Sequence, residues 1–121
     1  MILVVEDEVL VRMIATDILV DAGYCVLEAR DAEEAVVLLG ERTDVDLVVT
    51  DFEMPGAIDG LKLAHIIHER LPHVPTLLIS GRMRPAAADL PPGGRFLGKP
   101  FRSSGLVDAV QKCLGTGDGA M

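Results

Sequence analysis

The sequence is poor in features by which several large classes of protein are recognised. Aromatic residues make up 3% of its 121 residues, and although 50% are hydrophobic, no apolar run approaches the roughly 18 residues that a membrane-spanning helix needs. Basic residues are few: 11 Lys and Arg stand against 19 Asp and Glu, which gives a net charge of −8. Contacts with nucleic-acid phosphates require clustered positive charge, so neither nucleic acid nor a membrane is expected as a direct partner.

Cysteine is also scarce, and no positively charged leader precedes the first apolar run, residues 2–5. Cys25 falls in a predicted strand and Cys113 in a predicted helix. Two isolated thiols without a leader favour buried, unpaired cysteines over a disulfide or a metal pair. We therefore expect a soluble, cytoplasmic protein of one domain, with residues 1–114 forming the domain and 115–121 a flexible Gly-rich tail.

The chain does contain short apolar runs that alternate with stretches of helical spacing. The runs predict strands at residues 2–5, 25–28, 46–50, 76–79 and 95–97. Helices are predicted from near Glu8 to a stop at Gly23, from a cap at Asp31 through Leu39, over 61–71, and over 103–114. Strands that alternate with helices in this way predict a parallel, right-handed α/β sandwich.

The spacing also predicts which helix faces are buried. In the first helix the core stripe is Val11, Ile14, Ile18 and Ala22, and in the third it is Leu61, Ala64, Ile67 and Leu71. His65 and His68 lie off the second stripe and are expected to be solvated. Val9, Leu10 and Met13 lie outside the first stripe and close to the predicted site, which favours a docking surface for a helical partner.

A fourth helix should follow the fourth strand, but residues 81–94 contain three prolines and three glycines. Pro85 suits the first turn of a short helix over 86–90, and Pro91 and Pro92 would end it. We expect this segment to be short or irregular, and its length indicates a functional role.

Five polar residues come just after or at the ends of predicted strands: Glu6, Asp7, Asp51, Ser80 and Lys99. In an open parallel sheet they converge on one edge, where crowded carboxylates should have raised, coupled pKa values. All-oxygen ligands favour Mg²⁺ or Mn²⁺. Asp51 suits a nucleophile for a phosphoryl group, with Lys99 to neutralise the phosphoryl charge and Ser80 to donate a hydrogen bond to it.

Four segments carry a resemblance to a known family: VVEDE (4–8), VVTDFEMP (48–55), LISG (78–81) and FLGKPF (96–101). Together they resemble the receiver domain of two-component response regulators over nearly the whole chain. The resemblance implies a flavodoxin-like (βα)5 three-layer sandwich with strand order 2-1-3-4-5. It also implies a signalling module that catalyses its own aspartyl phosphorylation and dephosphorylation, rather than an enzyme with a separate substrate.

The resemblance further implies a role for each site residue. Asp51 accepts phosphate from a phosphohistidine on a histidine kinase or histidine phosphotransfer protein. Asp7, Asp51 and the backbone carbonyl of Glu53 bind Mg²⁺, and Glu6 acts through metal-bound water. Ser80 and Lys99 engage the phosphoryl group, and Phe96 is the aromatic switch residue. The Lys99-Pro100 peptide bond is expected to be cis.

The sequence departs from the family pattern at several points. Glu6 replaces the commoner Asp, the loop 54–60 is one residue longer than usual, and Phe96 lacks the hydroxyl of a Tyr. The irregular fourth helix weakens the usual dimer face, so we expect a monomer or weak dimer. Some receivers without a separate effector have a similar segment, which favours phosphate relay or sequestration over transcription control.

Two other functions use part of the same pattern. A haloacid-dehalogenase-like phosphatase also has an Asp nucleophile, a second acid two residues on (Glu53 here), a hydroxyl and a Lys, but nothing after Pro100 supplies its further acidic loop. A flavodoxin-like cofactor carrier shares the fold, yet Glu6, Asp7 and Glu8 would repel a phosphate. A receiver that is never phosphorylated is disfavoured by the complete set of reactive residues. The sequence leaves open the cognate kinase, the output, and whether the chain is free-standing or part of a larger protein.

Overall fold

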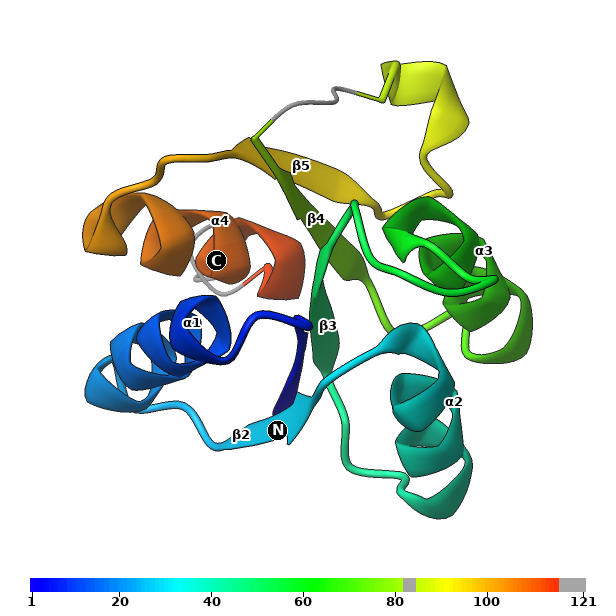
Figure 1. The fold of residues 1–121 in the computed structure, drawn as a ribbon, viewed down its shortest axis with the longest axis horizontal. Coiled ribbons are helices and arrows are strands. Elements are labelled where there is room, and N and C mark those ends of the chain that lie inside the picture. The colour runs from blue at the N-terminus through cyan, green and yellow to red at the C-terminus, as the bar shows by residue number, and fades with distance from the viewer. Residues whose placement is uncertain (82–84, 116–121) are drawn as a thin grey trace.

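A five-stranded parallel sheet forms the centre of the computed structural model, which describes residues 1–81 and 85–115 (Figure 1). Its strands are β1 (Ile2–Val5), β2 (Val26–Ala29), β3 (Leu47–Asp51), β4 (Thr76–Ser80) and β5 (Arg95–Gly98). They lie in the order β2-β1-β3-β4-β5, and every pair is parallel. The predicted flavodoxin-like sandwich and its strand order are confirmed.

Helices cover both faces of the sheet, as Figure 1 shows. Helices α1 (Val9–Asp21) and α4 (Ser103–Leu114) pack on one face, and α2 (Ala32–Glu41) and α3 (Gly60–Arg70) pack on the other. The side chain of Asp31 accepts a hydrogen bond from the Glu34 amide and so caps α2 as predicted, and Asp59 caps α3 in the same way. Gly23 has a φ of 98°, which is the left-handed conformation expected after the end of α1.

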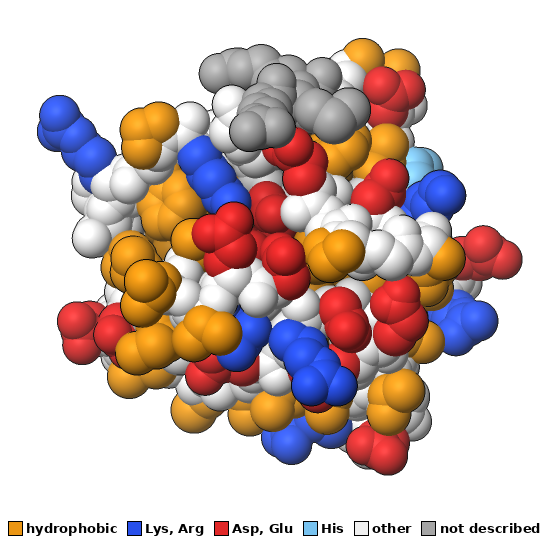
Figure 2. All heavy atoms as spheres, in the orientation of Figure 1, with side chains coloured by type: hydrophobic (Ala, Val, Ile, Leu, Met, Phe, Trp, Pro, Cys, Tyr) orange, Lys and Arg blue, Asp and Glu red, His pale blue; other side chains and the backbone are white. Residues whose placement is uncertain are grey.

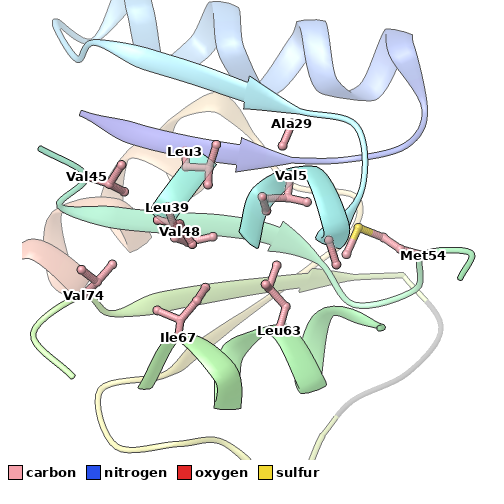
Figure 3. Close-up of a cluster of buried hydrophobic side chains, with 12 residues drawn as sticks. Leu3, Val5, Ala29, Leu39, Val45, Val48, Met54, Leu63, Ile67 and Val74 are labelled. Carbon is pink, nitrogen blue, oxygen red and sulfur yellow. The ribbon is translucent and has the colours of Figure 1, made fainter. Parts of the chain in front are cut away.

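The core consists of two apolar layers, one on each face of the sheet. Leu3, Val5 and Val48 pack towards α2 and α3, together with Leu63 and Ile67 (Figure 3). Their neighbours in the strands point the other way, so Ile2, Val4 and Val49 join Leu19 and Leu106 in the layer beneath α1 and α4. Strands buried on both faces explain the apolar runs without polar alternation.

The buried face predicted for α1 is wrong, because the helix is rotated about its own axis relative to the prediction. Ala15 and Leu19 are buried, whereas Ile14 is 57% exposed and Ala22 is exposed. The small side chain of Ala15 packs in the core layer between α1 and the sheet, whereas the bulkier side chain of Ile14 is turned to the surface. In α3 the prediction is right for Ala64 and Ile67, but Leu63 is fully buried, and Leu61 and Leu71 are only half-buried.

Some boundaries of strands and helices differ from the predicted ones by one or two residues. Strand β2 begins at Val26, so Cys25 precedes it and is exposed, which contradicts the predicted burial of that thiol. Cys113 is half-buried, and both cysteines are free. Among the described residues, no helix is long and apolar enough to cross a membrane.

A short 3-10 helix, η1 (Ala87–Asp89), stands where the fourth helix was expected. The predicted helix over 86–90 is therefore reduced to one turn, in which the Asp89 carboxylate accepts a hydrogen bond from the Ala86 amide. The ring of His65 contacts the Asp89 carbonyl oxygen at 2.7 Å, so this exposed histidine joins α3 to η1. Residues 82–84 and the predicted tail after Gly115 lie outside the described residues.

Candidate functional site

Residues from four strand ends meet at the carboxyl edge of the sheet. Val5 lies opposite Thr50 in the β1–β3 ladder, so Glu6 and Asp51, which follow them, leave the sheet side by side. Ser80 lies opposite Gly98 in the β4–β5 ladder, directly before Lys99. The predicted convergence of strand ends is confirmed.

Three of the predicted acids form a compact cluster. Glu6, Asp7 and Asp51 each offer a carboxylate oxygen, and these atoms lie within 4.8 Å of one another. Glu6 and Asp51 are buried, being 5% and 8% exposed, whereas Asp7 is exposed at the mouth of the site. The cluster is thus closed on the core side and open to solvent on the other.

Lys99 supplies the counter-charge to this cluster. Its Nζ lies 3.2 Å from Asp51 Oδ1 and 3.4 Å from Glu6 Oε1. Burial alone would lower the pKa of Lys99, but the two carboxylates outweigh it and raise that pKa above its ordinary value. The Lys99-Pro100 peptide that follows is cis, as predicted.

The pKa values of both buried acids are raised. Burial brings the pKa of Glu6 to about 7, with the Asp51 charge adding to the rise and the Glu8 amide and Lys99 opposing it. Burial also raises the pKa of Asp51, against the opposing charge of Lys99. One ammonium therefore does not compensate the crowded carboxylates, which is the condition that a divalent cation would relieve.

The residues present fit a hard divalent metal ion. The cluster offers only oxygen donors, one of them at the solvent-exposed mouth, which is the donor set that Mg²⁺ and Mn²⁺ prefer.

Ser80 has a partner that the sequence does not predict. Its hydroxyl donates a hydrogen bond to Glu53 Oε1 at 3.0 Å, so the β3–α3 loop is joined to the end of β4 across the site. The prediction for Glu53 concerned only its backbone carbonyl. Phe96 is half-buried on β5, in register with Leu78.

The start of α1 presents an apolar surface beside the acids. Val9, Leu10 and Met13 are 57%, 73% and 50% exposed, as predicted, and Ile14 extends this surface. Figure 2 shows apolar side chains gathered over α1, next to acidic side chains near the centre of the same face. An open groove of about 570 Å³ borders the surface and is lined by Val11, Ile14, Ile18, Gly81, Lys99, Pro100, Phe101 and Ser103.

Two further residues support the site and were missed in the sequence. A Cβ atom at Gly60 would lie 2.7 Å from the Phe52 Cα and closer still to the Asp51 carbonyl oxygen, so α3 begins in contact with the backbone of Asp51. Arg12 donates a hydrogen bond to the Glu6 carbonyl oxygen. The signal for Arg12 was a lone basic residue in the apolar run from Val9 to Ile14.

Comparison with known proteins agrees with this geometry. The model of the response regulator receiver domain family matches residues 2–111. The chain belongs to this family. It is a receiver domain of two-component signalling, with the phosphoacceptor role of such domains.

Individual relatives support the assignment. The nitrogen assimilation regulator NtrX of Azorhizobium caulinodans is 35% identical over 95% of this chain, but the chain spans only 26% of that protein. A chemotaxis protein CheY homologue of Campylobacter jejuni is 31% identical, with 98% of this chain and 95% of that protein covered. The receiver domain of NtrX from Brucella abortus has a TM-score of 0.87 at 33% identity, covering 96% and 99% of the two chains. The receiver domain of the hybrid histidine kinase CckA has a TM-score of 0.80 at 38% identity, covering 93% and 97%.

These matches decide among the functions that the sequence left open. A receiver accounts for the acid cluster, the lysine and the whole length from residue 2 to residue 111.

Proposed function

We propose that Asp51 is the phosphoacceptor of this receiver domain and takes its phosphoryl group from a phosphohistidine. A carboxylate oxygen of Asp51 attacks phosphorus in line, the P–N bond to the imidazole breaks, and the imidazole nitrogen keeps the bonding electrons and takes up a proton. The product is an acyl phosphate, which water later hydrolyses. The observation that carries the proposal is the Asp51 carboxylate held at 3.2 Å from Lys99 within a cluster of three acids.

The same proposal includes a metal. Asp7, Asp51 and the backbone carbonyl of Glu53 would hold Mg²⁺ or Mn²⁺, and Glu6 would act through metal-bound water. When bound, the ion would neutralise charge on the phosphoryl oxygens. Glu6 is already held by Lys99 and by the Glu8 amide at 3.2 Å, which suits an indirect role.

Lys99 and Ser80 are proposed to read the new phosphoryl group. The Lys99 ammonium is shared between two carboxylates and would turn to the phosphoryl oxygens, while the Ser80 hydroxyl would exchange Glu53 for one of them. The inward movement of Ser80 would let Phe96 and the segment after β4 repack, which is the two-state element of the switch. Because that segment has a 3-10 turn and no full helix in its described part, we favour phosphate relay or sequestration as the output.

The partner is proposed to be a histidine kinase or a histidine phosphotransfer protein, and the location cytoplasmic. The exposed apolar surface of Val9, Leu10 and Met13 lies beside the acids, where a helical phosphodonor must approach Asp51. An apolar side chain of that partner would fit the groove against Pro100 and Phe101.

The chemistry is tested by labelling with a small phosphodonor. With Mg²⁺ and acetyl phosphate, the intact mass should rise by one phosphoryl group, and Asp51→Asn should abolish this rise. Asp46→Asn, an exposed acid paired with the amino terminus, is the matched control and should label normally. Equal labelling of the Asp51 variant would overturn the assignment.

Docking is tested separately from chemistry. Leu10→Ser should slow phosphotransfer from a phosphorylated histidine partner at least tenfold while acetyl phosphate labels it at the normal rate. Val37→Ser, which removes an apolar side chain on α2 that is 58% exposed, should leave both rates unchanged. Slowed labelling by acetyl phosphate in Leu10→Ser would show that the surface serves folding and not docking.

A further inference from the structure

Arg12 joins the first turn of α1 to two other parts of the chain. Its Nη1 donates a hydrogen bond of 2.7 Å to the carbonyl oxygen of Glu6, and its Nε donates one of 3.1 Å to Glu28 Oε1 on β2. The Arg12 side chain is only 18% exposed, so this guanidinium is held in place and is not a freely solvated surface charge. It bridges α1, the end of β1 and the edge strand of the sheet.

The Glu6 carbonyl group is bonded directly to the backbone nitrogen of Asp7. It belongs to the peptide group that joins Glu6 to Asp7, in the turn between β1 and α1. The Glu6 amide donates to the Ala29 carbonyl at 3.0 Å, so β2 fixes one side of Glu6. Arg12 fixes the other side, and with it the orientation of the peptide from which Asp7 projects.

A charged donor at 2.7 Å is a strong constraint on such a turn. The backbone before α1 has no side-chain cap, because the N-cap residue Glu8 makes no capping hydrogen bond with its side chain. The guanidinium of Arg12 reaches back from the first turn of the helix and supplies a hydrogen bond to this part of the chain. Its planar fork allows two acceptors to be held at once, which an ammonium on a lysine does less well.

We propose that Arg12 is a positioning residue that sets the affinity of the acidic site for a divalent metal ion by holding the Glu6–Asp7 peptide. The proposal rests on the proposed function, because it takes Asp7 and Asp51 as the metal ligands. Arg12 acts through the backbone and not by touching the ion. Residues that orient metal ligands in this way typically change metal affinity 10- to 100-fold when they are lost.

The test measures binding of Mn²⁺ to the unphosphorylated domain by electron paramagnetic resonance of the free ion. Arg12→Met keeps the aliphatic stem and removes both hydrogen bonds, and it should weaken Mn²⁺ binding at least tenfold. Arg12→Lys should recover part of this loss. Glu28→Gln leaves an oxygen acceptor for Arg12 and does not alter the contact of Arg12 with Glu6. The affinity of this variant for Mn²⁺ should therefore stay within about twofold of that of the natural sequence.

Two controls separate positioning from stability and from the proposed function. Ile67→Val removes one buried methylene group from the opposite layer, so it lowers stability but should leave Mn²⁺ affinity unchanged. Asp7→Asn tests the ligand set itself: if it binds Mn²⁺ as well as the natural sequence does, the proposed metal site is wrong. If Asp7→Asn loses binding while Arg12→Met and Arg12→Lys both retain it, the proposed function stands and the role of Arg12 is overturned.

Discussion

The carboxyl group of Glu6 is buried among charges that pull its ionisation in opposite directions. Burial and the Asp51 carboxylate raise its pKa to about 7, and Lys99 and the Glu8 amide limit the rise. An ordinary Glu in an unfolded chain titrates near pH 4.3. Between these two values the folded protein keeps a proton that the unfolded chain releases, so stability falls as the pH rises through this window.

We therefore expect Glu6→Gln to stabilise the metal-free domain at pH 8, by up to about 3 kcal/mol. The gain should shrink as the pH falls and vanish below about pH 3, where Glu6 is protonated in both states. Urea unfolding at several pH values in the presence of a chelator measures this. If the difference in free energy of unfolding between the two proteins does not change with pH, Glu6 is not the group that causes the pH dependence.

Glu53 is a second residue whose side chain has a definite expected effect. It accepts the Ser80 hydrogen bond and adds negative charge to the site, so it opposes both the inward movement of Ser80 and the approach of an anionic donor. Glu53→Ala should speed labelling by acetyl phosphate several-fold, with little change in stability because Glu53 is half-buried at the surface. Glu53→Gln keeps an acceptor for Ser80 without the charge, so a rate as fast as that of the Ala variant would assign the effect to charge alone.

At this scale the sequence predicts which residues meet at the edge of the sheet, but not the contacts that hold them there. Asp51, Ser80 and Lys99 are fixed by strand ends, because a parallel sheet brings these ends together regardless of side-chain detail. The contacts of Arg12 with Glu6 and of Glu53 with Ser80 depend on side-chain reach between segments, and spacing along the chain carries no such information.

Among the elements, α1 shows why a correct helix can be given the wrong buried face. Nine of its thirteen residues are apolar, in the sequence VLVRMIATDILVD, so two different stripes fit the helical period. The structure buries Ala15 and Leu19 and leaves Ile14 at the surface, because α1 must pack against both the sheet and α4. When a helix also carries apolar residues on its exposed face, helical periodicity does not identify its core face.

The start of α3 can be tested with one added methyl group. At Gly60 that group would meet the backbone of Asp51 and Phe52, which cannot move aside cheaply. Gly60→Ala should therefore destabilise the domain by about 1 to 3 kcal/mol and slow labelling of Asp51. Gly40→Ala in α2 is the control, because a Cβ atom there meets nothing within 4 Å, and it should stabilise by about 0.5 to 1 kcal/mol. Equal behaviour of the two variants would contradict the close packing.

On the scale of the whole molecule, the acidic site opposes the stability that the core provides. Two buried carboxyl groups with raised pKa values disfavour the metal-free folded state at neutral pH, while a buried two-layer core maintains it. The topology that creates this arrangement could be predicted, because apolar runs and helix signals settle a parallel sheet. The size of the electrostatic cost could not, because it depends on how deeply each carboxyl group is buried.

A metal ion should reduce the repulsion among the crowded carboxylates and so stabilise the entire domain. A ligand that binds only the folded state adds about 2.7 kcal/mol when its concentration is 100 times its dissociation constant. We expect Mg²⁺ to raise the melting temperature by several degrees at pH 8 and by less at pH 6, because protonation of Glu6, whose pKa is about 7, removes a negative charge beside the ion. Asp7→Asn should abolish the rise at both pH values. A rise that is equal at pH 6 and pH 8, or that survives in the Asp7 variant, would place the bound ion elsewhere, because protonation of Glu6 must weaken a metal site built on this cluster.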